Sequence, residues 1–172
     1  MKVQGTHYRS IWYDHKACQV KIIDQRWLPH DFRIVALTNL DEFAVAIRDM
    51  WVRGAPLIGA TAAYGVAISL CNDASDSGLK NTYDTLIETR PTAINLKWAL
   101  DRLLRALGQV SQEERPARAL ELAHLVAEED VGINDIITST NPCITYIKTI
   151  LIVVAVVNIE TILLNKLSKL DK

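Results

Sequence analysis

Val52-Arg53-Gly54-Ala55-Pro56-Leu57-Ile58-Gly59 has the composition of a junction between a loop and a helix. Proline suits the first position of a helix, because its φ is already set and it lacks an N–H that would be left unbonded there. We therefore predict a helix over residues 56–70 that begins at Pro56. Its free backbone N–H groups, its positive dipole end and the guanidinium of Arg53 together suit a phosphate. The alternative is an ordinary junction with a solvated arginine.

A second segment repeats this arrangement. Thr89-Arg90-Pro91-Thr92 precedes a run with apolar residues at helical spacing: Leu96, Leu100, Leu103, Leu104 and Leu107. The residue before a proline favours extended backbone, so Arg90 is expected at the start of this helix with its side chain directed outward. Arg53 and Arg90, each at the start of a proline-initiated helix, predict a paired anion clamp. Alternatively, Arg90 is a surface residue balanced by Glu88.

Composition limits the class of protein. The chain has 172 residues, of which 49% are hydrophobic and 23% charged, as is typical of a globular domain with a buried core. A net charge of −1 argues against a nucleic-acid partner, which requires a basic face. Residues 1–7 lack the apolar core of a secretory signal, and the apolar run at 151–157 is too short to cross a membrane. We expect a cytoplasmic protein that binds neither nucleic acid nor membrane.

The side chains that most often bind metals or act as nucleophiles are scattered. The cysteines Cys18, Cys71 and Cys143 form no C-x-x-C pair, so neither a zinc site nor a disulfide framework is predicted. We expect Cys18 and Cys71 to be small core residues, because free cysteine is often buried. The histidines belong to no visible constellation: His7, His15, His30 and His124. The sequence predicts no metal and no cofactor.

The pattern of apolar residues predicts an α+β fold. Short β-rich runs at 10–13, 18–23 and 33–37 form a small amino-terminal β-hairpin unit over residues 1–37, with the hairpin turn at 14–16. A helical bundle follows over residues 38–135.

Residues that typically start, end or interrupt helices divide the helical part. Asn39 and Glu42 have a spacing like that of a capping box, at the start of a helix that ends near Gly54. Residues 72–78 read as a polar loop. Ser111 and Glu114 match a capping box. Because Pro116 disfavours continuation of a helix begun there, we expect a kink or a restart near Arg115 and a last helix to about residue 130.

The character of the chain changes near residue 136. Residues 136–172 contain one Ala and eight Ile, whereas residues 1–135 contain 17 Ala and 10 Ile. We predict a domain over residues 1–135 and a divergent apolar tail over residues 136–172. The tail is a separate domain, or, as its lack of caps, turns and a charge pattern favours, the product of a shifted reading frame; disorder is a further alternative for it.

Several segments resemble the amino-terminal portion of the S-methyl-5-thioribose-1-phosphate isomerase family. The similarity runs from about Tyr8 to Asn134, and its most specific parts are Arg53-Gly54-Ala55-Pro56 and Thr89-Arg90-Pro91-Thr92-Ala93-Ile94-Asn95-Leu96. Further matching segments are Asp24-Gln25-Arg26-Trp27-Leu28-Pro29, Ala62-Ala63-Tyr64-Gly65 and Ala127-Glu128-Glu129-Asp130. The wider superfamily includes ribose-1,5-bisphosphate isomerase and the regulatory alpha, beta and delta subunits of initiation factor 2B.

The resemblance implies a reaction and a set of binding residues. Family members convert 5-methylthioribose 1-phosphate to 5-methylthioribulose 1-phosphate in methionine salvage, and full-length members are expected to be homodimers. Carried over by motif, the substrate-binding residues are Arg53, Gly54, Ala55 and Arg90.

The resemblance also implies that catalytic groups are missing. The family's proton-transfer Cys and Asp lie in a Rossmann-like carboxyl-terminal domain, and neither of their segments occurs in this sequence. Cys143 lacks the neighbouring His of the family's Thr-His-Cys-Asn-type segment, and Asp130 and Asp135 match no catalytic motif. We therefore expect a truncated chain that keeps the clamp, has no catalytic residue and shows no isomerase activity alone.

Two other functions remain open at this point. One is a regulatory or scaffold protein of the initiation factor 2B-like superfamily that binds a sugar phosphate or nucleotide without chemistry. The other is an unstable truncation product, in which the small-residue helix after Pro56 has lost the neighbour that it was shaped to meet.

Overall fold

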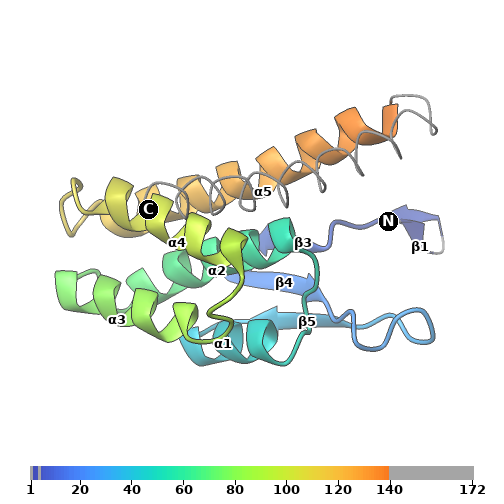
Figure 1. Ribbon diagram of the computed structural model, residues 1–172, viewed down its shortest axis with the longest axis horizontal. Helices are drawn as coiled ribbons and strands as arrows, with labels where there is room; N and C mark the ends of the chain where they lie inside the picture. The colour runs from blue at the N-terminus through green and yellow to red at the C-terminus, as the bar shows by residue number, and fades with distance from the viewer. Residues whose placement is uncertain (1, 4, 140–172) are drawn as a thin grey trace, which may run out of the picture. The chain divides into compact units, whose positions relative to one another are not determined.

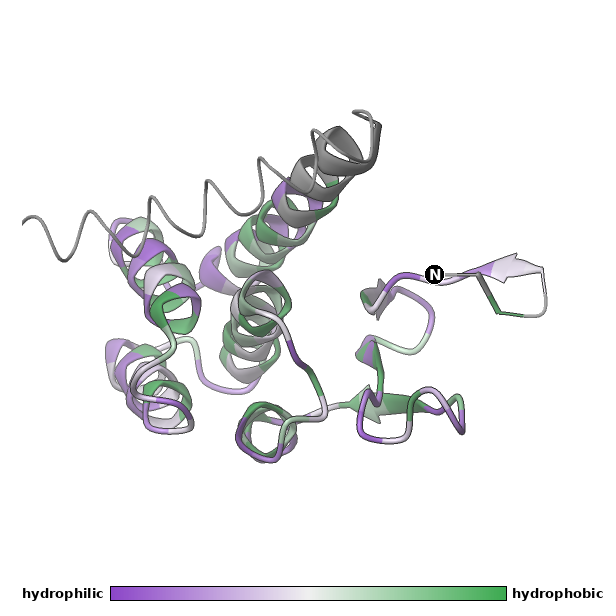
Figure 2. Cartoon of the chain, turned by 45° about the vertical axis from the view of Figure 1, so that its right-hand side comes forward, coloured by the Kyte–Doolittle hydropathy of each residue, from purple (hydrophilic) through white to green (hydrophobic). Residues whose placement is uncertain are grey.

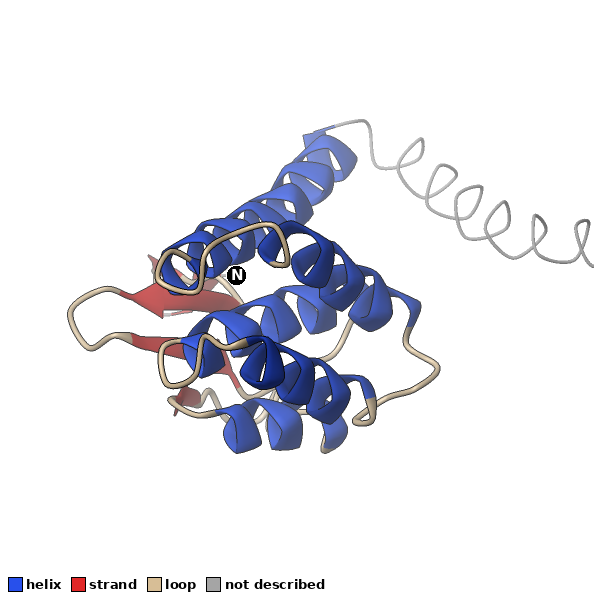
Figure 3. Ribbon diagram, turned by 90° about the vertical axis from the view of Figure 1, so that its left-hand side faces the viewer, coloured by secondary structure: helices blue, strands red, loops and turns tan. Residues whose placement is uncertain are grey.

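A computed structural model describes residues 2–3 and 5–139 of the chain (Figure 1). The chain divides into two units, residues 1–130 and 131–172, and every described element except the end of the last helix belongs to the first. The first unit combines a small antiparallel sheet with five helices, so the mixed α and β content predicted from the sequence is confirmed. Figure 3 shows the strands along one side of the helices.

The sheet has the strand order β3-β4-β5, with β3 at Ile11–Asp14, β4 at Gln19–Ile23 and β5 at Ile34–Leu37. The predicted hairpin is confirmed, with Ile11 opposite Ile22 and Asp14 opposite Gln19. The Asp14 carboxylate accepts hydrogen bonds from two backbone N–H groups of the turn, and this is the local chemistry expected of Asp there. A further hairpin, β1 (Lys2–Val3) with β2 (Thr6–His7), was not predicted.

Helix α1 spans Leu40–Arg48 and is capped as the sequence suggests. The Asn39 side chain accepts from the Glu42 N–H at 3.0 Å. The Glu42 carboxylate accepts from the Thr38 N–H at 2.6 Å, one residue earlier than in the standard box. The helix ends at Arg48, so the prediction of an end near Gly54 is wrong.

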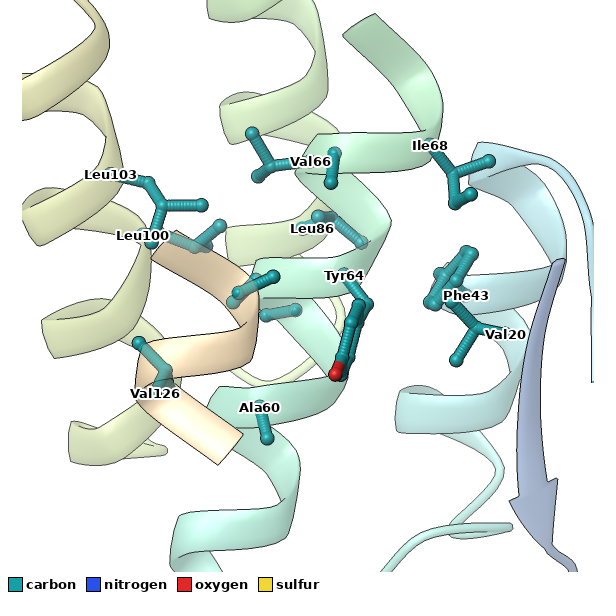
Figure 4. Close-up of a cluster of buried hydrophobic side chains, with 14 of the residues drawn as sticks. Val20, Phe43, Ala60, Tyr64, Val66, Ile68, Leu86, Leu100, Leu103 and Val126 are labelled. Atoms are coloured by element: carbon teal, nitrogen blue, oxygen red, sulfur yellow. The ribbon is translucent and has the colours of Figure 1, made fainter. Parts of the chain in front are cut away.

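Helix α2 spans Ala55–Leu70 and is the central element of the core, with thirteen of its sixteen residues buried. It contacts α1, α3, α4 and β3, and the colouring of Figure 2 shows apolar residues where helices face one another. Figure 4 shows Phe43 and Val20 on one side of α2 and Leu100 and Leu103 on the other.

Small residues on α2 allow this close packing. A Cβ added to Gly59 would lie 3.1 Å from the carbonyl oxygen of Asn95, and one added to Gly65 would lie 3.2 Å from Phe43. The expectation that this helix lacks its neighbour is therefore wrong, because the neighbours are α1, α3 and α4 of the same chain.

Three more helices complete the bundle: α3 at Asp76–Ile87, α4 at Ile94–Leu107 and α5 at Arg115–Ser139. The sequence analysis missed α3, whose cap, Ser75, lies inside the segment predicted as a loop. The predicted helix at 56–70 is confirmed, since α2 has Pro56 in its first turn, but the start of α4 was placed wrongly, since α4 begins three residues after Pro91.

Helix α5 begins at Arg115, so the predicted restart there is confirmed and the capping box at Ser111 is wrong. The Ser111 hydroxyl donates to the Glu114 carboxylate, but the intervening residues form a turn. The helix continues past the predicted end near residue 130 to Ser139. The division at residue 135 stays a prediction, and Cys143 and the apolar run 151–157 lie outside the described residues.

Candidate functional site

The segment between α1 and α2 forms a tight arch that carries Arg53. Its first residue, Met50, has a φ of 59°, and its last, Gly54, has a φ of 93° and is the N-cap of α2. At the end of α1 the Trp51 N–H donates to the Ala46 carbonyl at 2.9 Å and the Met50 N–H donates to the Ile47 carbonyl at 3.4 Å. This pair of bonds is the Schellman arrangement, which requires a left-handed residue and usually recruits glycine. A methionine in that conformation costs about 1–2 kcal/mol of backbone strain. Residues in such strained backbone conformations cluster at functional sites.

Arg53 is exposed and its backbone is fixed by another part of the chain. Its N–H donates to the side-chain carbonyl of Gln25 at 2.8 Å, and its Nε donates to the Met50 carbonyl at 3.4 Å. Gly54 can adopt its positive φ because it lacks a Cβ, and a Cβ built there would meet no atom within 4 Å. Conformation, not space, therefore selects glycine at residue 54.

Arg90 lies in the connection between α3 and α4. The Ala93 N–H donates to the Arg90 carbonyl at 2.9 Å, and this bond closes a turn that places Pro91 and Thr92 before the helix. The prediction that proline starts this helix is wrong, because Ala93 is the N-cap of α4. Arg90 is nevertheless close to the helix start and is half-buried.

Both arginines line one open hollow of about 420 Å³. Its lining comes from the arch, the start of α2, the turn after α3 and the start of α4: Met50, Arg53, Gly54, Ala55, Ile58, Arg90, Thr92, Ala93, Ile94 and Asn95. The four residues predicted to bind substrate are thus brought together, although Arg53 and Arg90 are 37 positions apart in the sequence. A hollow of this size fits a small metabolite.

Neither Arg53 nor Arg90 forms an ion pair with a carboxylate among the described residues. Most other arginines of the unit do, for example Arg26 with Asp24 and Arg102 with Glu129. Two guanidinium groups that line one hollow without a carboxylate partner among the described residues favour an anion there. The hollow is therefore electrostatically suited to a phosphate or another multivalent anion.

The helix starts add to this potential. The side chains of Asn39 and Ser75 cap α1 and α3, whereas no side chain caps α2 or α4. The first N–H groups of α2 and α4 therefore stay available, and they carry the positive ends of the helix dipoles. Because the Gly59 contact draws α2 against Asn95, both starts border the same hollow.

Apolar side chains also line the hollow. The exposed fractions of Met50 and Ile94 are 41% and 66%, which is high for residues of this size, and the buried Ile58 also belongs to the lining. A ligand that combines an anionic group with a small apolar group would suit both kinds of lining residue.

The lining contains no carboxylate, thiol or imidazole. Across the described part of the chain, no three His, Cys, Asp or Glu side chains are grouped so as to hold a metal. The hollow can therefore bind and orient an anion, but its described side chains offer no group suited to moving protons near neutral pH.

Two expectations about other reactive residues are wrong. Cys18 and Cys71 are exposed, because Cys18 lies in the β3–β4 turn with a φ of 51° and Cys71 lies at the C-cap of α2. His15 and His124 are not isolated, because their rings stack with centroids 5.8 Å apart. No sequence pattern could have revealed this pair, since the two residues are 109 positions apart.

Burial shapes the chemistry around His124. The Tyr64 hydroxyl and His124 Nδ1 are 2.9 Å apart, and burial raises the pKa of Tyr64 to about 12. Burial, assisted by neighbouring His15, lowers the pKa of His124. Tyr64 therefore keeps its hydroxyl proton and His124 is neutral near pH 7. This group joins α2, β3 and α5 and is absent from the lining of the hollow.

Comparison with known proteins gives a consistent family. The model of the initiation factor 2 subunit family matches residues 51–167, a match that extends beyond residue 135. The chain is 57% identical over 134 residues to a protein of Cereibacter sphaeroides named methylthioribose-1-phosphate isomerase, with 78% of this chain and 36% of that protein covered. An Escherichia coli protein of the same name is 54% identical over 133 residues, with 77% and 36% covered. The chain thus spans little more than a third of the length of these curated relatives.

Two solved structures share the fold. The 5-methylthioribose 1-phosphate isomerase of Pyrococcus horikoshii matches with a TM-score of 0.66 and 35% identity, over 72% of this chain and 36% of that one. The delta subunit of the translation initiation factor eIF-2B from A. fulgidus matches with a TM-score of 0.65 and 39% identity, over 73% and 38%. Among the described helices, none has the length and apolar character needed to span a membrane.

Proposed function

The chain belongs to the initiation factor 2 subunit family, and we propose that it forms the sugar-phosphate-binding part of a methylthioribose-1-phosphate isomerase. In this proposal Arg53, Gly54, Ala55 and Arg90 bind the phosphate of 5-methylthioribose 1-phosphate. Met50, Ile58 and Ile94 contact its apolar methylthio group. The observation that carries the proposal is the presence of two guanidinium groups without carboxylate partners, among the described residues, in one hollow.

The chemistry of the lining indicates which part of the reaction this chain can perform. Converting the aldose to the ketose requires opening of the sugar ring and transfer of hydrogen between C1 and C2, and both steps move protons. General acids and bases contribute typically about 10²–10⁴-fold and must be within hydrogen-bond reach. The described lining has no such group, so we infer that this chain binds the sugar phosphate and that turnover needs residues from outside the described part.

Calorimetric titration with 5-methylthioribose 1-phosphate tests the binding. A charge-assisted hydrogen bond contributes about 1.5–3 kcal/mol, so Arg53→Met and Arg90→Met are each expected to weaken binding by roughly 10- to 100-fold. The matched control is Arg48→Met, which removes the same charge from the exposed end of α1, outside the lining. Equal affinities of all three variants would refute the proposal, and an assay for the ketose product is expected to show no turnover by the wild-type chain.

The similarity to an archaeal initiation-factor subunit supports a second candidate, a regulatory protein that binds a ligand without chemistry. Thermal-shift titrations with guanine and adenine nucleotides distinguish the two. Stabilisation by a nucleotide at concentrations where the sugar phosphate has no effect would favour the regulatory candidate. Stabilisation by the sugar phosphate alone is the expected result.

A further inference from the structure

Gln25 contacts the arch that carries Arg53 from a distant part of the chain. It lies two residues after β4 and is half-buried. Its backbone N–H donates to the Trp51 carbonyl at 2.8 Å, and its side-chain carbonyl accepts from the Arg53 N–H at 2.8 Å. One residue therefore binds the arch on both sides of the fully buried Val52.

The residues beside Gln25 reinforce this attachment. Asp24 is buried, and both of its oxygens accept from the Arg26 guanidinium, at 2.9 Å from Nε and 2.6 Å from Nη2. The Arg26 guanidinium in turn lies over the Trp51 ring, 4.5 Å from its centroid, at a distance that permits a cation–π contact. The Asp24 N–H donates to the Arg33 carbonyl, which ties the same stretch to the segment that leads into β5. Residues 24–26 thus form a firm base for the arch.

The arch needs such a base because Met50 holds a costly left-handed conformation at its first position. Residues 51–53 belong to no helix or strand, so no helical or sheet hydrogen bonds fix their backbone. A residue in such a conformation persists when surrounding contacts over-determine it. The Gln25–Arg53 bond lies next to the flexible Arg53 side chain, and fixing the backbone there limits where the guanidinium can reach.

We propose that Gln25 is a positioning residue for the hollow, whose side-chain carbonyl holds the Arg53 backbone so that the guanidinium faces Arg90 across a bound phosphate. The inference deepens the proposed function and rests on it for the identity of the anion. Gln25 is absent from the lining and acts only through Arg53. A binding group held within about 0.5 Å by a supporting residue loses less freedom when the ligand arrives, so the support appears as affinity.

The test combines amide hydrogen exchange, followed by NMR on the full chain, with titration by inorganic phosphate. Gln25→Met removes the acceptor and keeps the side-chain length, and Gln25→Glu keeps an acceptor in reach. Gln112→Met is the matched control, because Gln112 is exposed in the turn before α5 and is absent from the lining of the hollow. In Gln25→Met we expect faster exchange of the Arg53 amide and about tenfold weaker phosphate binding, since one hydrogen bond contributes roughly 1 kcal/mol or slightly more.

The readouts separate positioning from general stability. Gln25→Glu is expected to restore slow exchange at Arg53, and Gln112→Met to resemble the wild type in both measurements. Unchanged exchange and unchanged phosphate affinity in Gln25→Met would overturn the proposal. If Gln25→Met does not fold, Gln25→Asn replaces it in the same two measurements. The Asn side chain is one methylene shorter, so its amide does not reach the Arg53 N–H. If the wild type binds no phosphate, the proposed function fails by itself, and exchange at Arg53 still decides whether Gln25 holds this backbone.

Discussion

Replacing Arg115 by methionine is expected to destabilise the chain more than replacement of an exposed arginine on the same helix. The Arg115 side chain is only 6% exposed and lies at the start of α5. It forms hydrogen bonds to three backbone carbonyls outside that helix. Its Nε donates to the Leu107 carbonyl at 3.1 Å and the Val110 carbonyl at 3.2 Å, and its Nη1 donates to the Ala74 carbonyl at 2.9 Å. These bonds hold the end of α4 and the segment before α3 against α5.

The magnitude follows from which of these bonds are shielded from water. The ion pair with Asp76 contributes little, because the Asp76 side chain is 82% exposed and paired charges at the surface are worth about 0–1 kcal/mol. The bonds to carbonyls come from a buried, charged donor, and each such bond is worth about 1.5–3 kcal/mol. Counting Nε and Nη1 as two donors, and noting that methionine retains the apolar stem, we expect a loss of about 3–5 kcal/mol.

Urea unfolding followed by circular dichroism measures this loss. With a slope of about 1–3 kcal/mol per molar urea, the midpoint should fall by roughly 2 M. The matched control is Arg118→Met, which removes only the exposed pair with Glu121 and should cost less than about 0.5 kcal/mol. A loss below about 1 kcal/mol in Arg115→Met, or equal losses in the two variants, would show that the carbonyl bonds do not stabilise the start of α5.

Three further predictions concern other parts of the unit. Burial lowers the pKa of His124 below its ordinary value of 6.5, so the imidazole is protonated at a higher pH in the unfolded chain than in the folded one. The free energy of unfolding should therefore fall as the pH drops below about 6.5. His124→Gln should flatten this pH dependence in thermal unfolding, whereas the control His30→Gln, at an exposed position, should not. Gly59→Val should push the starts of α2 and α4 apart, with a loss of about 1–3 kcal/mol in urea and weaker phosphate binding, and unchanged binding would contradict it. Gly78→Ala should destabilise α3, because the new Cβ would lie 2.4 Å from the Asp73 carbonyl oxygen. This clash should outweigh the gain of about 1 kcal/mol in helix propensity, and a higher urea midpoint in the variant would disprove the prediction.

Local signals in the sequence predicted the elements whose causes are local. The hairpin of β3 and β4 follows from alternating apolar residues around a short polar turn, and the Asn39 cap follows from side-chain spacing. The four residues proposed to bind substrate could be named because two short motifs are specific to the family. That they share one hollow was predicted only as a clamp. The small residues of α2 indicate close packing, but the sequence does not show that Gly59 meets the Asn95 carbonyl.

The elements and contacts that the sequence did not predict also have physical reasons. Helix α3 was read as a loop at its start because Asn72, Asp73, Ser75 and Gly78 are all turn-forming types, yet here Asp73, Ser75 and Gly78 build its cap. Gly78 is required by the close approach of Asp73, not by flexibility. The end of α1 was placed too late because Met50 gives no warning of a left-handed conformation that usually calls for glycine. Gln25 acts over 28 positions, a distance that no periodicity can bridge.

The small residues of α2 have a double consequence, because the same packing that stabilises the core also shapes the hollow. Gly59 costs the isolated helix about 1 kcal/mol relative to alanine. In the folded chain this cost is offset by the close contact with α4, which excludes water between two buried helix faces. The contact lies about one turn from the start of α2 and at the start of α4, so it also sets the spacing between the uncapped N–H groups that border Arg53 and Arg90. Substitutions at Gly59 should therefore change stability and phosphate affinity together, whereas substitutions at Gln25 should change affinity with a smaller effect on stability. This difference separates residues that build the hollow from a residue that aims one of its side chains.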